Sequence, residues 1–166
     1  MGAESAAGGK KSAAYRALNA QLTALFAGER DGLANAANLS AVLYHTLPDL
    51  NWVGFYFLRG GELVLGPFQG QVACVRIPLG RGVCGTAAQS RETLIVADVH
   101  AFPGHIACDA ASRSEIVVPL IHHDRLWGVL DLDSPVAARF DADDGIGLNA
   151  IAALLLHSSD LDRLTR

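Results

Sequence analysis

Three cysteines are the residues of this sequence best suited to redox chemistry. Cys74, Cys84 and Cys108 do not have the Cys-x-x-Cys spacing of a zinc ribbon or of a thioredoxin-like site. Cys84 lies among glycines near the predicted start of a helix, where backbone N–H groups can lower the pKa of a thiol. Cys108 follows Pro103-Gly104 in a long loop. Two cysteines in such loops favour thiol oxidation chemistry, whereas Cys74 on a strand is typical of a buried, inert thiol.

One other interpretation of the cysteines stays open at this point. The three thiols could bind zinc together with His100 or His105. An odd number of cysteines in a chain without an export signal is not typical of a secreted disulfide scaffold. We therefore expect a soluble, cytoplasmic protein whose cysteines stay reduced in the resting state.

Three acidic residues are predicted to share one face of a hairpin formed by residues 115–121 and 126–133. Asp131 and Asp133 alternate onto the same face of their strand, about 7 Å apart. Glu115 lies opposite one of them if the connecting loop holds an odd number of residues. Like charges that face each other across a sheet are destabilising, so a proton, a metal ion or a cationic ligand must compensate them.

Crowding of this kind raises the pKa of at least one carboxyl group and leaves a protonated acid available near neutral pH. A substrate that carries an ammonium and needs a proton would suit such a patch. The alternative is that Glu115 and Asp133 are solvated at the ends of their strands.

Two aromatic residues could form the wall of a ligand site beside this patch. In the strand predicted over 51–58, Trp52, Gly54 and Tyr56 alternate onto one face. Trp52 and Tyr56 would then stand about 13 Å apart with a glycine floor between them, which makes a slot for a small apolar group. The alternative is a second core face covered by a helix. The opposite face is a normal core face and holds Val53, Phe55 and Phe57.

The elements that must position these residues alternate between helical and strand patterns. Residues 1–11 are small and polar and are expected to form a flexible tail, so that a single domain covers residues 12–166. Ser12 is the expected cap of the first helix, Asp31 caps a second helix, and Asp141 with Asp144 resembles the capping box of a last one. The pattern predicts an α+β fold with helices on one side of an antiparallel sheet. The remaining predicted elements are strands at 62–68, 74–78 and 93–97, a glycine-rich loop at 80–85, a short helix at 86–90 and a long loop at 99–114.

The composition narrows the classes of partner. The chain has 166 residues, of which 51% are hydrophobic, and its formal net charge is −4. This balance argues against a nucleic-acid partner, because affinity for a phosphate backbone rests on a cationic surface. No apolar run reaches the roughly 18 residues that a membrane-spanning helix needs, so no membrane partner is expected.

Four stretches of the sequence resemble the free methionine-(R)-sulfoxide reductases, a family of enzymes built on a GAF-type domain. They are NWVGFYFL (51–58), LVLGPFQGQVACVRIPLGRGVCGTA (63–87), DVHAFPGHIACDAASRSEIVVPL (98–120) and GVLDLDSP (128–135). The resemblance covers residues 12–160 and includes all three cysteines in their sequence contexts. It implies a GAF-like fold, with a six-stranded antiparallel sheet, helices on one face and a ligand pocket on the other. It also implies a homodimer and the reduction of free methionine (R)-sulfoxide without a cofactor or metal.

The resemblance also implies a role for each candidate residue. Cys108 matches the nucleophile, which would become a sulfenic acid, and Cys84 and Cys74 match its disulfide partners, in an order that the sequence leaves open. The substrate-binding positions are Trp52, Tyr56, Glu115, Asp131 and Asp133. Thioredoxin would reduce the disulfide. The competing interpretations are a GAF-type sensory module for a small molecule and a thiol redox sensor.

Overall fold

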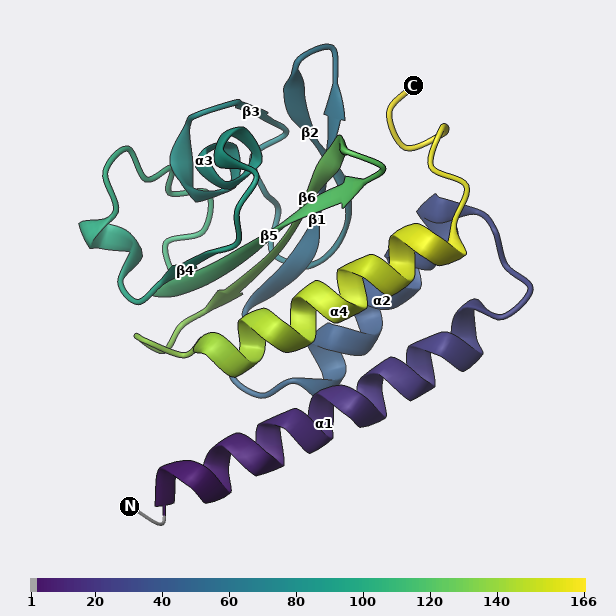
Figure 1. Cartoon of the computed structure of the whole chain (residues 1–166). Helices are drawn as coiled ribbons and strands as arrows, with labels where there is room; N and C mark the ends of the chain where they lie inside the picture. The colour runs from purple at the N-terminus through teal and green to yellow at the C-terminus, as the bar shows by residue number, and fades with distance from the viewer. Residues whose placement is uncertain (1–2) are drawn as a thin grey trace.

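A six-stranded antiparallel sheet forms the centre of the computed structural model, which describes residues 3–166, with side chains from residue 8 onward (Figure 1). The strand order is β3-β2-β1-β6-β5-β4, which confirms the expected α+β fold. The strands are β1 (Trp52–Arg59), β2 (Glu62–Gly70), β3 (Arg76–Pro78), β4 (Leu94–Val96), β5 (Ser114–His122) and β6 (Arg125–Ser134). The helices are α1 (Ala3–Phe26), α2 (Gly32–Thr46), α3 (Gly82–Ser90) and α4 (Ala142–Ser158), and a short 3-10 helix, η1, covers Val99–Ala101.

The two faces of the sheet carry two separate apolar clusters. Helices α1, α2 and α4 cover one face, and α3 lies over the other together with the loops (Figure 1). Val53, Phe55 and Phe57 point into the large cluster beneath α1, α2 and α4, as their alternation predicts. Trp52 and Tyr56 point into the smaller cluster beneath α3.

Helix caps follow the predicted pattern at two of the three expected positions. The Asp31 carboxylate accepts hydrogen bonds from the backbone N–H groups of Leu33 and Ala34 at the start of α2. Asp141 and Asp144 form a complete capping box at the start of α4. Each cap satisfies N–H groups that the helix itself leaves without partners.

The first helix begins earlier than the sequence predicts. Helix α1 starts at Ala3, so the described part of the expected flexible tail is helical and Ser12 is not its cap. Two effects account for the longer helix. Its first residues are rich in alanine, which has the highest helix propensity. The Lys11 ammonium also lies 2.7 Å from carboxylate oxygens of both Asp141 and Asp144, which ties this turn to the start of α4.

Helix α3 also differs from its prediction, because it starts at Gly82 and not at Thr86. Cys84 therefore lies in the first turn of α3 and not in the loop before it. Within residues 3–166, no helix is long and apolar enough to cross a membrane.

The hairpin of β5 and β6 sets the register of the acidic residues. Its turn is the pair His123-Asp124, both with left-handed backbone (φ 50° and 60°), as tight hairpins require. A turn of even length would place Glu115 opposite an apolar residue. A β-bulge corrects this, because Ile121 pairs with Leu126 while Leu120 pairs with Gly128, so that Trp127 is the extra residue. Glu115 therefore pairs with Asp133 and Val117 with Asp131.

Gly128 makes the bulge possible. Replacement of this glycine tests how strongly the bulge depends on it. Its φ is +156°, and a Cβ atom there would overlap the carbonyl oxygen of Tyr56 on β1. Gly128→Ala is expected to lower the free energy of unfolding by about 2–5 kcal/mol through backbone strain and overpacking. Urea denaturation measures the change.

Gly9→Ala is the matched control for this prediction. Gly9 lies within α1 with no atom within 4 Å of an added Cβ. The same substitution there is expected to raise stability by about 0.5–1 kcal/mol. A Gly128→Ala protein as stable as the wild type would show that the bulge does not require glycine.

Candidate active site

A pocket opens on the face of the sheet that α3 covers. Strands β1, β5 and β6 form its floor, α3 forms one wall, and the loops that carry Cys74 and Cys108 form its rim. Seven of the eight candidate residues of the sequence analysis line it: Trp52, Tyr56, Cys84, Cys108, Glu115, Asp131 and Asp133. The eighth, Cys74, is bonded through its sulfur to Cys108, and its neighbour Ala73 lines the pocket.

The three predicted carboxyl groups do share one patch of the pocket floor. Glu115 on β5 and Asp131 on β6 are both buried, and the register places Asp133 directly opposite Glu115. Burial, followed by the neighbouring Asp131 and Asp133, raises the pKa of Glu115 well above its usual range. Burial also raises the pKa of Asp131, to about 6. Near neutral pH the patch therefore holds at least one proton that it can donate, as the crowding argument predicts.

Asp133 is the third member of the patch and the one nearest the Cys108 loop. Burial raises its pKa, and the charges of Asp131 and Asp109 raise it further. A hydrogen bond from Ser112 acts in the opposite direction. Asp133 therefore connects the acidic floor to the loop that carries the expected nucleophile.

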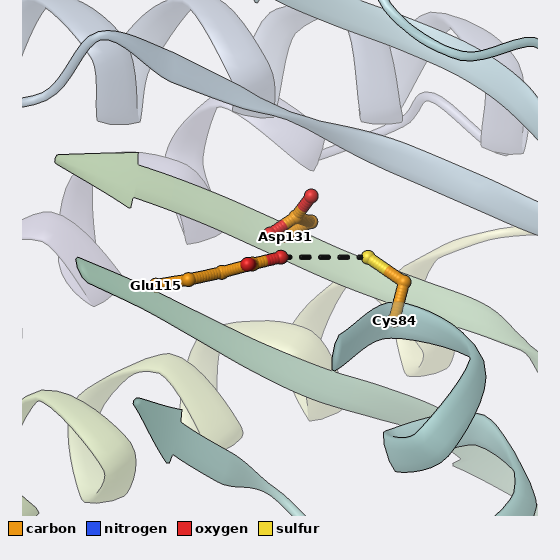
Figure 2. Close-up of side chains that lie close together, drawn as sticks. All are labelled: Cys84, Glu115 and Asp131. Atoms are coloured by element: carbon orange, nitrogen blue, oxygen red, sulfur yellow. Dashed lines mark hydrogen bonds between the residues drawn. The ribbon is translucent and has the colours of Figure 1, made fainter. Parts of the chain in front are cut away.

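Cys84 is a buried free thiol against this floor. Its Sγ–H donates to Glu115 Oε1, with Sγ and Oε1 3.8 Å apart, and Asp131 lies beside them (Figure 2). Burial, together with the charges of Asp131 and Glu115, raises the pKa of the Cys84 thiol well above its usual range. The expectation that a helix N-terminus lowers this pKa is wrong, because burial and two carboxylates outweigh the backbone N–H groups.

A disulfide joins Cys74 and Cys108, with their Cα atoms 5.5 Å apart. The two residues come from loops 34 positions apart in the sequence. The expectation that all three cysteines stay reduced does not hold in this structure, because both loops fold over the same pocket. The alternative of a three-cysteine zinc site also fails here, since two of the three sulfurs are bonded to each other.

The aromatic residues do not form the open slot that strand spacing predicts. The Trp52 ring stacks on Tyr56, with ring centroids 5.9 Å apart, and on Phe68 of β2, at 5.3 Å. Trp52 leans over Gly54, so that a Cβ atom there would lie 2.6 Å from the indole. The spacing of Cα atoms along a strand does not predict where long side chains turn. Trp52 and Tyr56 instead form a continuous aromatic wall along the pocket.

Hydrogen bonds from β1 and the residue before it hold both rim loops in place. The Trp52 indole N–H donates to the Gln71 carbonyl (3.1 Å), and the Tyr56 hydroxyl donates to the Cys74 carbonyl (2.9 Å). Burial raises the pKa of Tyr56, which keeps its hydroxyl protonated as a donor. These contacts give the two aromatic residues a second role beside lining the pocket.

Asn51 holds the second loop and was not among the residues singled out from the sequence. Its side-chain amide donates to Asp109 Oδ2 and to Ser112 Oγ, both at 3.0 Å. Asp109 directly follows Cys108, so this contact fixes the loop beside the disulfide. The partners are 58 and 61 positions from Asn51 in the chain, so no local sequence pattern could have revealed them.

One group of side chains has the spacing of metal ligands. Cys84, Glu115 and Asp131 each offer an atom, and these atoms lie within 4.8 Å of one another. A thiolate and two carboxylates could hold a divalent ion such as Zn²⁺. All three groups have raised pKa values, so protons compete with a metal ion for them.

The comparisons with known proteins agree with this geometry. A model of the GAF domain family matches residues 12–156. The free methionine-R-sulfoxide reductase of Escherichia coli is 56% identical over 141 residues, which cover 85% of this chain and 86% of that protein. The chain belongs to the free methionine-R-sulfoxide reductase family. The yeast protein of the same name, from Saccharomyces cerevisiae, is 45% identical over 147 residues, 81% of this chain and 82% of its own length.

A solved structure of the family superposes closely. The free methionine-R-sulfoxide reductase of Neisseria meningitidis, in complex with its substrate, has a TM-score of 0.86 and 49% identity, and 89% of each chain is covered. The family that the four sequence stretches indicate is therefore confirmed. The similarity to these reductases extends over nearly the whole chain, because each match covers more than four fifths of it.

The buried acids of this reductase-family pocket predict an unusual pH dependence of stability. The usual pKa of an aspartate is 3.8, and that of folded Asp131 is about 6. Between these values the folded state binds more protons than the unfolded state, so stability falls as the pH rises. The difference for Asp131 alone corresponds to about 3 kcal/mol. Urea unfolding of the disulfide form from pH 4 to pH 8 measures it.

Asp131→Asn should flatten this pH dependence, because the amide does not titrate. Asp162→Asn is the control, since Asp162 is exposed and its substitution should leave the wild-type profile unchanged. A wild-type stability that rises with pH over this window would contradict the raised pKa values.

Proposed function

We propose that this protein reduces free methionine (R)-sulfoxide to methionine. The observation that carries the proposal is a disulfide between two loop cysteines at the rim of a pocket whose floor holds three crowded carboxyl groups, two of them buried. Such a pocket combines a thiol pair, an acid and a site for a cation. The Escherichia coli and Neisseria meningitidis relatives named free methionine-R-sulfoxide reductase support the same activity.

The first step of the proposed reaction is attack by the Cys108 thiolate on the sulfoxide sulfur. A protonated carboxyl group of the acidic floor donates its proton to the sulfoxide oxygen. Glu115 suits this role because burial and two neighbouring acids raise its pKa. The bond between the methionine sulfur and the oxygen breaks, the protonated oxygen becomes bonded to Cys108 Sγ as a sulfenic acid, and methionine leaves.

In the second step a thiol condenses with the Cys108 sulfenic acid and releases water. Cys74 is the partner that we propose, because it forms the disulfide with Cys108 while Cys84 stays hydrogen-bonded to Glu115. A protein dithiol of thioredoxin type, with a potential of about −270 mV, would then restore both thiols by exchange. Every step uses thiols and carboxyl groups of this chain, and none needs a metal ion or cofactor.

The acidic floor also accounts for selectivity toward the free amino acid. Within residues 3–166, Asp131 Oδ1 is buried without a hydrogen-bond partner, so it can accept a hydrogen bond from a ligand ammonium. A methionine sulfoxide inside a peptide has no ammonium and would leave the carboxylates uncompensated, which costs several kcal/mol. Trp52 and Tyr56 would hold the S-methyl end.

The homodimer that the resemblance implies stays a prediction, as does a cytoplasmic location.

A stereospecific assay tests the proposed activity. The reduced protein is incubated with free methionine (R)-sulfoxide, free methionine (S)-sulfoxide and N-acetylated methionine sulfoxide, and the product is quantified with thioredoxin recycling and with dithiothreitol. We expect turnover of the free (R) form and at least about a hundredfold lower kcat/KM for the N-acetyl form. Activity on the (S) form alone, or on neither free form, would overturn the proposal. A sensory module or peroxide sensor would not consume thiols in proportion to the sulfoxide.

Substitution of single cysteines tests their proposed roles. Cys108→Ser should abolish methionine formation. Cys74→Ser should release about one methionine per protein and then stop with thioredoxin as reductant, because no disulfide can form. Cys84→Ser should continue to turn over. Quenched-flow yields and steady-state rates measure both phases, and recycling lost in Cys84→Ser but kept in Cys74→Ser would reverse the assignment.

A further inference from the structure

The loop of residues 71–75 between β2 and β3 combines a redox-active cysteine with two exposed valines. Val72 is 84% exposed and Val75 is 60% exposed. Val72 is the most exposed large apolar side chain among the described residues, and Val75 is third, after Ile146. Both lie within two positions of Cys74, whose sulfur is bonded to Cys108. Exposed apolar residues that lie together on a surface are a feature of protein contact sites.

The inner side of this loop is tied to the sheet. Trp52 and Tyr56 donate hydrogen bonds to the carbonyl groups of Gln71 and Cys74, and the Leu65 N–H donates to the Val75 carbonyl at 2.9 Å. Three bonds over five residues hold the backbone, so the exposure of the two valines is a property of the ordered loop. This arrangement presents a fixed apolar surface at the disulfide.

We propose that Val72 and Val75 form the docking surface for the protein dithiol that reduces the Cys74–Cys108 disulfide, and that this dithiol attacks Cys74. The inference rests on the proposed function, because it concerns the recycling step of that reaction. The reductant's thiolate bonds to Cys74 Sγ, the bond between Cys74 and Cys108 breaks, and Cys108 leaves as a thiolate. The reductant's second thiol then attacks the mixed disulfide, which releases Cys74 and oxidises the reductant.

Charge also favours attack at Cys74 over attack at Cys108. Asp109 directly follows Cys108 and is held there by a hydrogen bond from the Asn51 side-chain amide. An incoming thiolate is repelled by the Asp109 carboxylate. The neighbours of Cys74 in the loop are uncharged: Gln71, Val72, Ala73 and Val75. Attack at Cys74 also returns Cys108 directly to the thiolate form that the first step uses.

Val75→Ser is the variant that tests the docking surface, because Val75 is exposed and does not line the pocket. Turnover is measured with thioredoxin at varied concentration and with dithiothreitol. We expect the KM for thioredoxin to rise about tenfold, because the contact loses apolar area, while turnover with dithiothreitol is unchanged. Val72→Ser should raise the KM for thioredoxin in the same direction. Ile146→Ser, a substitution of an exposed residue on α4, is the control and should leave that KM unchanged.

A trapping experiment tests the attacked sulfur. Thioredoxin that lacks its second active-site cysteine is mixed with the oxidised protein, and the mixed disulfide is located by peptide mass spectrometry. A linkage to Cys74 supports the proposal, and a linkage to Cys108 overturns it.

Three further outcomes would overturn the docking surface. The first is an unchanged KM for thioredoxin in Val75→Ser, and the second is an equal loss of turnover with dithiothreitol. The third is a changed oligomeric state with an unchanged KM for thioredoxin, which would show that the valines form a contact between copies of this chain. Failure of the proposed function would be separate, because no methionine would then form with dithiothreitol in the wild-type protein.

Discussion

Three carboxyl groups crowd one face of the central sheet, and most of the pocket follows from the cost of placing them there. In a low-dielectric environment like charges repel strongly, and an ion without a partner is destabilising. The protein responds by holding at least one proton among these acids near neutral pH, as the raised pKa values of Glu115, Asp131 and Asp133 indicate. The same crowding that is unfavourable for folding provides a proton and a place for a cation. Stability and the proposed chemistry are therefore linked through the same side chains.

The acids could be assigned to one patch from the sequence because strand alternation is a local property. Asp131 and Asp133 share a face whatever the rest of the chain does. The position of Glu115 depended on register, which the two-residue turn alone would have set wrongly. The bulge at Trp127 adds the one residue that shifts the register and brings Glu115 opposite Asp133. The sequence pattern does not predict this bulge. The capping residues Asp31 and Asp141 were predictable for the same reason as the acids, since a cap is defined within one helical turn.

Long-range contacts were the part that sequence reasoning could not supply. The early start of α1 depends on hydrogen bonds from the Lys11 ammonium to Asp141 and Asp144, which lie 130 and 133 positions further along the chain. The bond between Cys74 and Cys108, and the contacts of Asn51, join loops whose separation in the chain carries no pattern. The family resemblance named candidate cysteines but left their pairing open. The side-chain direction of Trp52 likewise depends on Phe68 from a neighbouring strand.

The hairpin of β5 and β6 carries the whole acidic floor within twenty-one residues, Ser114–Ser134, while the cysteines come from elsewhere in the chain. The proposed recognition of the substrate ammonium and the proposed thiol chemistry are thus encoded in separate stretches of sequence. Substitutions in the loops could remove the redox step without altering the strands that form the acidic floor. Evolution could convert such a scaffold from a catalyst into a receptor for the same amino acid, or back again, through changes confined to its surface loops.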